Sequence, residues 1–500
     1  MNPLPRRSTL PALVTSLLLA ACAAALDQPI AHAGQWPPPW QDPPDIVQRA
    51  DTPPHFEPPS ARHCRRLPTT REVGGRDQQR QDAAWERRES TDAATPTRRA
   101  RSAAEAAAKS MAPATAGATA APLAADSAAH ERHVPPVPWP QPHPLPSPQR
   151  PAHEPVTAGM VDDNADFGEY LAYRQRKAGL PVHERDVSER YLLEVTDAAG
   201  RPVHDAEVAM QRAGVADPVM WARTDTAGRV WLHPRAFLPP GAMHEHALGV
   251  AVRKHGLQGR AMLSRGQPQA VQLRLGGAAP VIRPRLDLVF LVDATGSMDD
   301  EIAKLKASMR TMSQQIAQLP GQPDICYGLV AYRDRGDAFL TRSHDFTDDL
   351  PAFQRMLARL HAGGGGDKPE ALNEALHEVV HGLSWRADAA RIVVLVADAA
   401  PHLDYGGPQY DTDMQAALAK GIKLFAVGTS GLEPEGEYIY RQIAQYTAGR
   451  FVFLTYRDAA DPGSGPGTQT PHDVSQYSVQ TLDKLIVRLV SEEMARLRPT

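Results

Sequence analysis

The stretch "FLVDATGSMDDEI", Phe290 to Ile302, decides the fold of the largest part of this chain. An apolar run ends at Asp293, and an acidic segment with the pattern of a helix begins only a few residues later. Thr295 and Ser297 lie between the two. A buried strand that ends on an acid and turns into a helix gathers oxygen atoms at the carboxyl end of the strand. Hard divalent cations bind at such places.

The same alternation of apolar runs and amphipathic segments continues from Arg283 to the end of the chain. The predicted strands are "LDLVFLVD", "ICYGLVAYRD", "RIVVLVAD", "IKLFAVGT" and "FVFL". The predicted helices cover residues 301–318, 350–361, 369–383, 411–420, 436–448 and 479–496. Continuously apolar strands separated by amphipathic helices require a mostly parallel sheet with both faces covered. We therefore expect a doubly wound α/β domain over residues 283–500.

Three loops of this domain place acids or hydroxyls after a predicted strand or beside one. The first loop holds Asp293, Thr295 and Ser297, the second is "GGGGDKPE" with Asp367, and the third follows "RIVVLV" with Asp398. In open α/β sheets such loops converge at the carboxyl ends of the strands. Helix capping alone explains single acids at these positions, but it does not require three coincident loops.

At these residues the chain resembles the von Willebrand factor type A (VWA) domain with its metal-ion-dependent adhesion site. The family motif is Asp-x-Ser-x-Ser, and Thr295 stands at the first Ser position while Ser297 stands at the second. The resemblance implies that Asp293, Thr295 and Ser297 are metal ligands or hold water ligands, and that Asp398 acts in the third loop. It also implies that an acidic side chain of a partner protein completes the coordination, without bond breaking.

The second loop departs from the family pattern, because Asp367 stands where many VWA domains have threonine. A charged ligand should bind the cation more tightly and leave it less electropositive toward a partner carboxylate. The four preceding glycines allow close approach of the backbone. An oxygen-only ligand set suits Mg²⁺, with Mn²⁺ and Ca²⁺ as alternatives.

The segment "HEVVH", His377 to His381, matches the H-E-x-x-H signature of zinc peptidases. On a helix the buried stripe falls on the surrounding leucines, valines and alanines, so both histidines are expected on the polar side. No third ligand follows at a familiar spacing. "RGD", Arg335 to Asp337, is expected to be a turn after a strand.

Upstream of this domain the chain changes character several times. Residues 186–280 alternate oily and polar positions between turn residues, which predicts a small antiparallel β-sandwich that resembles immunoglobulin-like or carboxypeptidase-regulatory-like domains. Residues 161–185 contain a short helix after an Asp or Asn N-cap. Residues 23–160 are rich in Pro, Ala and Arg and are expected to form a disordered tether.

The amino terminus predicts export. Two arginines precede an apolar run from about residue 10 to residue 25, which fits a secretory signal. "LAAC", Leu19 to Cys22, resembles the lipobox of bacterial lipoproteins, so residues 1–22 are expected to be a lipoprotein signal with Cys22 as the lipidated residue. The residue after Cys22 is alanine, which by the same resemblance favours the outer membrane. Ordinary signal cleavage, giving a periplasmic or secreted protein, remains the alternative.

Composition limits the classes of partner and function that the chain can have. A formal net charge of −4 gives no overall attraction to nucleic acid. The three cysteines, Cys22, Cys64 and Cys326, predict no disulfide framework, with Cys64 in the tether and Cys326 in the core. We therefore expect a non-enzymatic module for cation-dependent protein recognition at the bacterial cell envelope. A zinc peptidase that uses His377, Glu378 and His381, and a scaffolding VWA domain without metal, are the alternatives.

Overall fold

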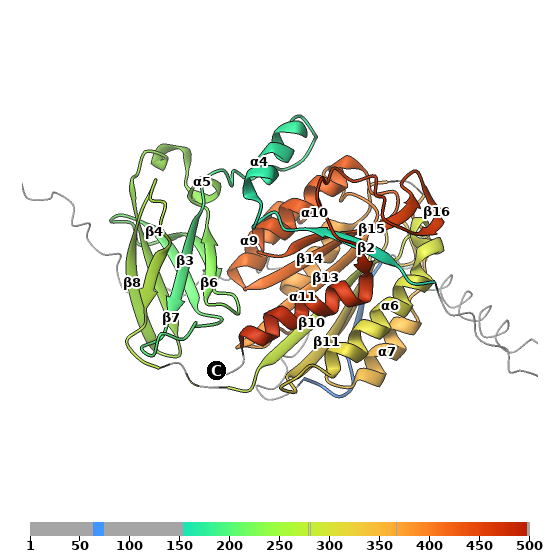
Figure 1. Cartoon of the computed structure of the whole chain (residues 1–500), viewed down its shortest axis with the longest axis horizontal. Coiled ribbons are helices and arrows are strands. Elements are labelled where there is room, and N and C mark those ends of the chain that lie inside the picture. The colour runs from blue at the N-terminus through green and yellow to red at the C-terminus, as the bar shows by residue number, and fades with distance from the viewer. Residues whose placement is uncertain (1–63, 75–153, 279, 281, 367, 498–500) are drawn as a thin grey trace, which may run out of the picture.

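The computed structural model describes residues 64–74, 154–278, 280, 282–366 and 368–497, and all structural statements below concern these residues (Figure 1). They form an α/β domain and a smaller β-sandwich beside it (Figure 1). The predicted signal peptide and Cys22 lie outside these ranges. No helix within them is both long enough and apolar enough to cross a bilayer.

Five parallel strands form the centre of the α/β domain, as the sequence predicts. They are β10 (Arg285–Asp293), β11 (Asp324–Tyr332), β13 (Ala389–Ala397), β14 (Ile422–Gly428) and β15 (Arg450–Asp458). Within the sheet their order is β11-β10-β13-β14-β15. Because β10 is central, its side chains are buried on both faces: Phe290 packs into one hydrophobic core and Leu291 into the other.

Helices cover both faces of this sheet, which confirms the doubly wound prediction. One core contains residues of α6 (Asp299–Ala317), α7 (Leu350–Ala358) and α11 (Leu482–Arg496). The other contains residues of α8 (Leu372–His377), α9 (Tyr410–Ala419) and α10 (Pro434–Tyr446). A π-helical turn, Glu378–Gly382, extends α8, so the predicted single helix over 369–383 is shorter and irregular.

The sheet is wider than predicted because antiparallel strands extend both edges. On one side β11 pairs with β12 (Thr341–Thr347), and β12 pairs with β1 (Thr70–Val73). On the other side β15 pairs with β2 (Thr157–Val161) and with β16 (Asp461–Pro466), and β2 pairs with β17 (Gln480–Thr481). Strands β1 and most of β2 fall inside residues 23–160, so the prediction of a disordered tether does not hold for these two segments.

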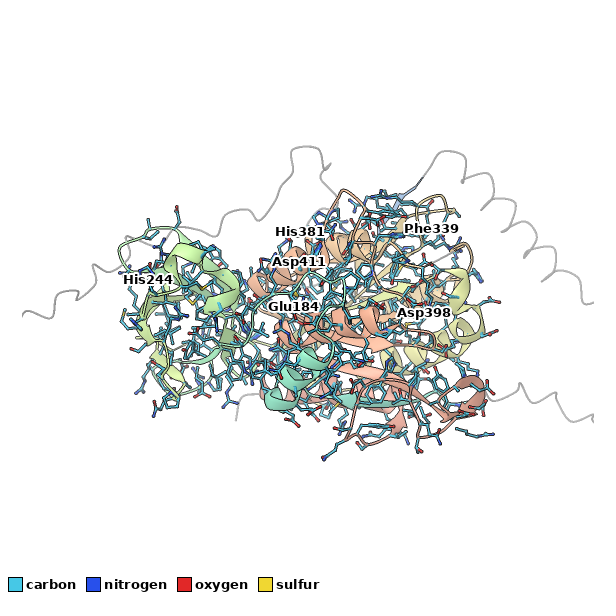
Figure 2. All side chains as sticks on the ribbon, turned by 90° about the horizontal axis from the view of Figure 1, so that it is seen from above. Glu184, His244, Phe339, His381, Asp398 and Asp411 are labelled. Atoms are coloured by element: carbon cyan, nitrogen blue, oxygen red, sulfur yellow. A yellow bond between two sulfur atoms is a disulfide. The ribbon has the colours of Figure 1, made fainter. Side chains whose placement is uncertain are left out.

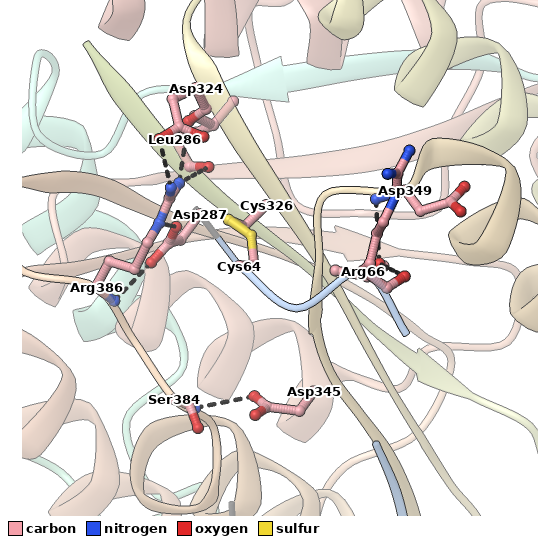
Figure 3. The surroundings of a disulfide bond; sticks show 11 residues. Cys64, Arg66, Leu286, Asp287, Asp324, Cys326, Asp345, Asp349, Ser384 and Arg386 are labelled. Carbon is pink, nitrogen blue, oxygen red and sulfur yellow. Dashed lines mark hydrogen bonds and ion pairs between the residues drawn. A yellow bond between two sulfur atoms is a disulfide. The ribbon is translucent and has the colours of Figure 1, made fainter. Parts of the chain in front are cut away.

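A disulfide between Cys64 and Cys326 fixes the first of these segments to the sheet (Figure 3). The two Cα atoms are 5.9 Å apart, within the range that a disulfide spans. Cys326 lies in β11 and is fully buried. The expectation that the cysteines form no disulfide is therefore wrong, because pairing across 262 residues leaves no spacing pattern in the sequence.

The predicted sandwich is present and contains seven strands. One sheet has the order β6-β3-β9 and the other β5-β4-β7-β8. The strands are β3 (Tyr191–Thr196), β4 (Glu207–Arg212), β5 (Pro218–Arg223), β6 (Arg229–Leu232), β7 (Ala247–Lys254), β8 (Leu257–Ser264) and β9 (Val271–Arg274). All pairs are antiparallel except β3 with β9, which is parallel. The short helix α4 (Phe167–Arg176) precedes it, and Asp166 accepts a hydrogen bond from Glu169 N as its N-cap.

The sandwich is inserted between two strands of the α/β sheet, β2 and β10. Charged side chains join the two parts. Buried Asp205 of the sandwich accepts hydrogen bonds from Arg391 of β13, with 2.8 Å between Oδ1 and Nη1. Lys254 Nζ lies 2.5 Å from Asp388 Oδ1. These ion pairs are largely shielded from solvent and lie where the two parts meet.

Candidate functional site

The predicted first-loop residues form a hydrogen-bonded chain at the carboxyl end of β10. Asp293 Oδ1 accepts from the backbone N of Thr295 at 2.9 Å and from Thr295 Oγ1 at 2.6 Å. Thr295 Oγ1 in turn lies 3.1 Å from Ser297 Oγ. Asp293 and Thr295 are fully buried. Thus a carboxylate and two hydroxyls project from one turn between β10 and α6.

The third predicted loop joins this chain directly. Ser297 Oγ donates to Asp398 Oδ1 at 3.0 Å. Asp398 follows β13, which lies beside β10 in the sheet, and only 2% of its surface is exposed. Figure 2 labels Asp398 within the α/β domain, on the side away from the sandwich. The structure therefore brings Asp293, Thr295, Ser297 and Asp398 together, as the sequence predicts.

The glycine-rich loop packs its backbone against the first loop. Gly296 N donates to Gly364 O at 2.9 Å, and Gly363 N donates to Ala294 O at 3.0 Å. Gly365 has a φ of +61°, and a Cβ there would lie 2.8 Å from Thr295 Cβ and 2.7 Å from Glu370 Oε1. The glycines thus allow the second loop to approach the site. Asp367, the predicted ligand of this loop, lies outside the described residues.

Burial and a neighbouring carboxylate raise the pKa of Asp293. Its pKa is raised to about 7, first because the carboxyl is removed from water and then because Asp398 is close. Among the described residues, neither Asp293 Oδ2 nor the nearby Tyr332 hydroxyl has a well-formed hydrogen bond. Of the causes that act on the pKa of Asp293, the Tyr332 hydroxyl is the smallest, and it lowers the pKa. A buried anionic oxygen without a partner is costly unless a cation neutralises it.

Glu370 is a further acid of this site that the sequence did not single out. It is 1% exposed, and its Oε2 has no hydrogen-bond partner among the described residues. Its pKa is raised to about 9 by burial and then by the surrounding carboxylates, of which Asp293 contributes most. The only signal in the sequence was its place at the end of "GGGGDKPE".

A lysine from the chain itself lies beside these acids. Lys368 Nζ is 3.3 Å from Asp398 Oδ2 and donates to the backbone oxygens of Asp398 and Gly431 at 2.8 and 2.7 Å. About a quarter of the Lys368 side chain is exposed. The lysine therefore places one positive charge beside Asp398 at a partly exposed position.

The side chains present fit a hard divalent cation. The described donors are carboxylate and hydroxyl oxygens only, which suits Mg²⁺, Mn²⁺ or Ca²⁺. Two buried oxygens, Asp293 Oδ2 and Glu370 Oε2, have no hydrogen bond of good geometry among the described residues. Burial is the main cause of the raised pKa of both acids and the nearby carboxylates add to it, so a cation at this place would favour their ionised forms.

A groove of about 630 Å³ opens beside the site, with Ser297 in its lining. Its walls come from the first turns of α6, from β15 and β16, and from the start of β2. Lys304 and Tyr456 line it together with Glu301, whose carboxylate accepts from the Tyr456 hydroxyl at 2.8 Å. A segment of a partner lying in this groove would pass within reach of Ser297.

The HEVVH and RGD motifs lie outside this group of ligands. Glu378 of "HEVVH" is buried and forms an ion pair with Arg71 of β1, so the residue that a zinc peptidase would use as base is neutralised by another strand. In "RGD", Asp337 turns inward and accepts from Asp334 N at 3.1 Å and from Gly365 N at 2.8 Å. This tripeptide is a turn that supports the glycine loop, as expected.

The fold and the site together define a class of protein. Residues 287–460 match the von Willebrand factor type A domain model, so the chain contains a VWA domain, whose sheet in this structure is extended by strands from outside the matched range. Domains of this family often mediate protein–protein interaction or adhesion.

Individual relatives share only this part of the chain. The alpha-protein kinase vwkA of Dictyostelium discoideum is 31% identical over 171 residues, which is 33% of this chain and 27% of the kinase. The human von Willebrand factor A domain-containing protein 7 is 37% identical over 95 residues, 19% of this chain and 10% of that protein. The solved pilus adhesin SpaC from Lactobacillus rhamnosus GG aligns over 52% of this chain and 34% of its own, with 12% identity and a TM-score of 0.29. The matched segment thus spans about a quarter or less of these two sequence relatives.

Proposed function

We propose that this chain recognises a partner protein through a divalent cation held by Asp293, Thr295, Ser297 and Asp398. The observation that carries the proposal is the unbroken chain of contacts from Asp293 Oδ1 through both hydroxyls to Asp398 Oδ1. Beside it, Asp293 Oδ2 is buried without a well-formed hydrogen bond among the described residues. When bound, the cation would act as a Lewis acid and bind a carboxylate group of the partner. Mg²⁺ is the expected ion.

The residues of the chain itself perform three tasks in this proposal. The carboxylates of Asp293 and Asp398 supply negative charge to the cation. The hydroxyls of Thr295 and Ser297, which lie between them, supply neutral oxygen ligands. The glycine loop holds the first loop in place through its backbone contacts. The groove beside Ser297 offers the partner a surface next to the ion. Binding of this kind needs no catalytic group, and we propose no enzymatic activity.

An extracytoplasmic location completes the proposal, with Cys22 as a lipid anchor to the outer membrane. The buried Cys64–Cys326 disulfide supports an oxidising compartment, because disulfides persist outside the reducing cytoplasm. Labelling of the full chain with a radioactive fatty acid, compared with Cys22→Ala, tests the anchor separately from recognition.

Two measurements test the recognition proposal. Mn²⁺ should bind the full chain at a site that Asp293→Ala abolishes and Ser297→Ala weakens, while the far-ultraviolet circular dichroism stays unchanged. A pull-down from envelope extract should then recover partners that are released by a chelator and restored by Mg²⁺. Partners that remain bound after chelation, or that Asp293→Ala still captures, would exclude a cation-bridged mode and favour a scaffolding domain.

A further inference from the structure

A second cluster of possible metal ligands lies between α8 and α9, away from the carboxylate site. His377 ends α8, His381 lies in the π-helical turn that follows, and Asp413 lies in the first turn of α9. His377 Nδ1 is 3.1 Å from Asp413 Oδ1, and His381 Nε2 is also 3.1 Å from the same oxygen. Figure 2 places His381 and Asp398 at clearly separate positions on the domain.

The spacing of the three donor atoms is close to that of a metal site. All three lie within 4.8 Å of one another. A tetrahedral Zn²⁺ with bonds of about 2.0–2.1 Å separates its ligands by roughly 3.3 Å. The two distances of 3.1 Å to Asp413 Oδ1 are therefore already close to the edge of such a tetrahedron. Their rings stack with centroids 4.4 Å apart, as expected one helical turn apart.

The burial of the cluster favours an ion that keeps one position open. The Asp413 side chain is 3% exposed, that of His381 12% and that of His377 28%. Asp413 thus lies at the bottom of the cluster and the histidines lie at its rim. Three protein ligands with an open side match the arrangement in which water or another donor fills the fourth position of Zn²⁺.

Asp413 Oδ1 faces one ring nitrogen of each histidine. The ionised carboxylate only accepts hydrogen bonds. Each histidine nitrogen that faces it therefore carries a proton in the metal-free protein, and an ion would take the place of these two protons.

We propose that His377, His381 and Asp413 bind one Zn²⁺ ion, which ties α8 to α9. Two imidazoles select a transition metal over Mg²⁺ or Ca²⁺, so this site differs in chemistry from the oxygen-only site. It is not a peptidase centre, since Glu378 is engaged by Arg71. On binding, each neutral imidazole keeps one proton, which moves to its other nitrogen, while the freed nitrogen donates its lone pair to the ion.

Lys420 opposes this change at one histidine. Its Nζ lies 3.4 Å from His381 Nδ1 and donates to Val380 O at 2.9 Å. An ammonium group beside Nδ1 favours a lone pair there and keeps the proton on Nε2, where the ion must bind. Zn²⁺ binding therefore requires Lys420 to turn away, and its positive charge also repels the ion.

The first arm of the test removes ligands in the full chain, stripped of metal with a chelator and then desalted. Zn²⁺ is titrated by calorimetry in the presence of excess Mg²⁺, and Co²⁺ absorption reports the ligand geometry. The chain has 19 histidines, so stoichiometry alone does not locate the ion and the variants decide. His377→Gln, His381→Gln and Asp413→Asn should each weaken this site by about 100-fold, since even changes behind metal ligands cost 10–100-fold. Asp293→Ala should leave it unchanged.

The second arm guards against variants that fail to fold. Lys420→Gln should bind Zn²⁺ about tenfold more tightly, through loss of repulsion, and a misfolded protein cannot show that gain. Zn²⁺ should also raise the melting temperature of the parent chain but not of His381→Gln. The proposal is overturned if His381→Gln retains the Zn²⁺ site, if Asp293→Ala loses it, or if Lys420→Gln gains no affinity.

Discussion

At the scale of single residues, two neighbouring glycines show how strictly the carboxylate site is built. Gly365 has a positive φ, and any side chain there would meet Thr295 and Glu370. Gly366 has no positive φ, and a Cβ there would meet no atom within 4 Å. Gly365 therefore cannot be replaced without backbone strain and steric overlap, whereas Gly366 can.

We predict that Gly365→Ala destabilises the fold and the cation site together. The left-handed backbone and the contacts with Thr295 and Glu370 should cost roughly 1–3 kcal/mol of unfolding free energy. Mn²⁺ affinity should fall as well, because Thr295 has to shift. Urea denaturation and Mn²⁺ titration measure the two effects. Gly366→Ala is the matched control and should change stability by no more than about 0.5 kcal/mol; equal effects of both substitutions would contradict the assigned role of Gly365.

Lys368 leads to a second prediction at this scale. Its ammonium group already partly balances Asp398, so it competes with a divalent cation for the same charge. Lys368→Gln should raise Mg²⁺ affinity by about tenfold, since a nearby positive charge is removed. Calorimetric titration of the metal-free chain tests this. Lys304→Gln, which removes a lysine from the neighbouring groove, should have a smaller effect, and weaker binding by Lys368→Gln would show that the lysine supports the site instead.

The residues of the site were predictable where they follow strands of the parallel sheet. Asp293 and Asp398 each stand directly after an apolar run, so their convergence follows from the order of the strands. Glu370 and Lys368 lie at the end of a glycine loop, whose path is set by contacts with Ala294 and Asp337 that no local pattern encodes. Their roles became visible only when the loop was placed in space.

At the scale of elements, the edge strands show where local pattern fails. Strand β12 buries polar side chains, including Ser343 and Asp345, so it lacks the apolar run that marks the central strands. Strands β1 and β2 are short and pair with partners hundreds of residues away in the chain. Hydrophobic periodicity predicted the five central strands and the helices, but long-range pairing of short polar strands leaves no comparable signal.

The Cys64–Cys326 disulfide holds one of these edge elements, and its removal gives a third prediction. In Cys64→Ser, segment 64–74 keeps only its strand pairing and side-chain contacts, such as the 2.7 Å contact from Arg342 Nε to Glu72 Oε2. Unfolding free energy should fall by roughly 2–5 kcal/mol, and proteases should cut this segment first. Cys22→Ser, which leaves the disulfide intact, is the control. Unchanged stability and unchanged cleavage in Cys64→Ser would mean that β1 docks independently of the bond.

At the scale of the whole molecule, the sandwich is fixed to the α/β domain by buried charges rather than by apolar surface alone. Asp205 meets Arg391 at one end of the contact. At the other, Glu493 of α11 accepts from Thr226 of the sandwich at 2.6 Å and lies 2.7 Å from Lys423 Nζ. Because the sandwich is inserted between β2 and β10, both of its connections return to the same sheet. Its position should therefore depend on these pairs as much as on the linkers.

Glu493 allows this dependence to be tested by pH. Burial, the largest single cause, would raise its pKa, but the charge of Lys423 and the hydrogen bonds from Lys423 and Thr226 together outweigh burial and lower the pKa from 4.5 to about 2. A carboxylate whose pKa is lower in the folded state stabilises the fold fully above its unfolded pKa, and this stabilisation is lost as the pH falls from about 4.5 to about 2.

Glu493→Gln should therefore cost roughly 3 kcal/mol of unfolding free energy near pH 7, because Lys423 is left without its main partner. The difference from the parent should shrink through that acidic range. Unfolding free energies of both proteins between pH 2 and 8 measure it, with exposed Glu492→Gln as the control. A difference that stayed constant down to pH 2 would mean that Glu493 acts through packing, and the sandwich would then be fixed by shape rather than by charge.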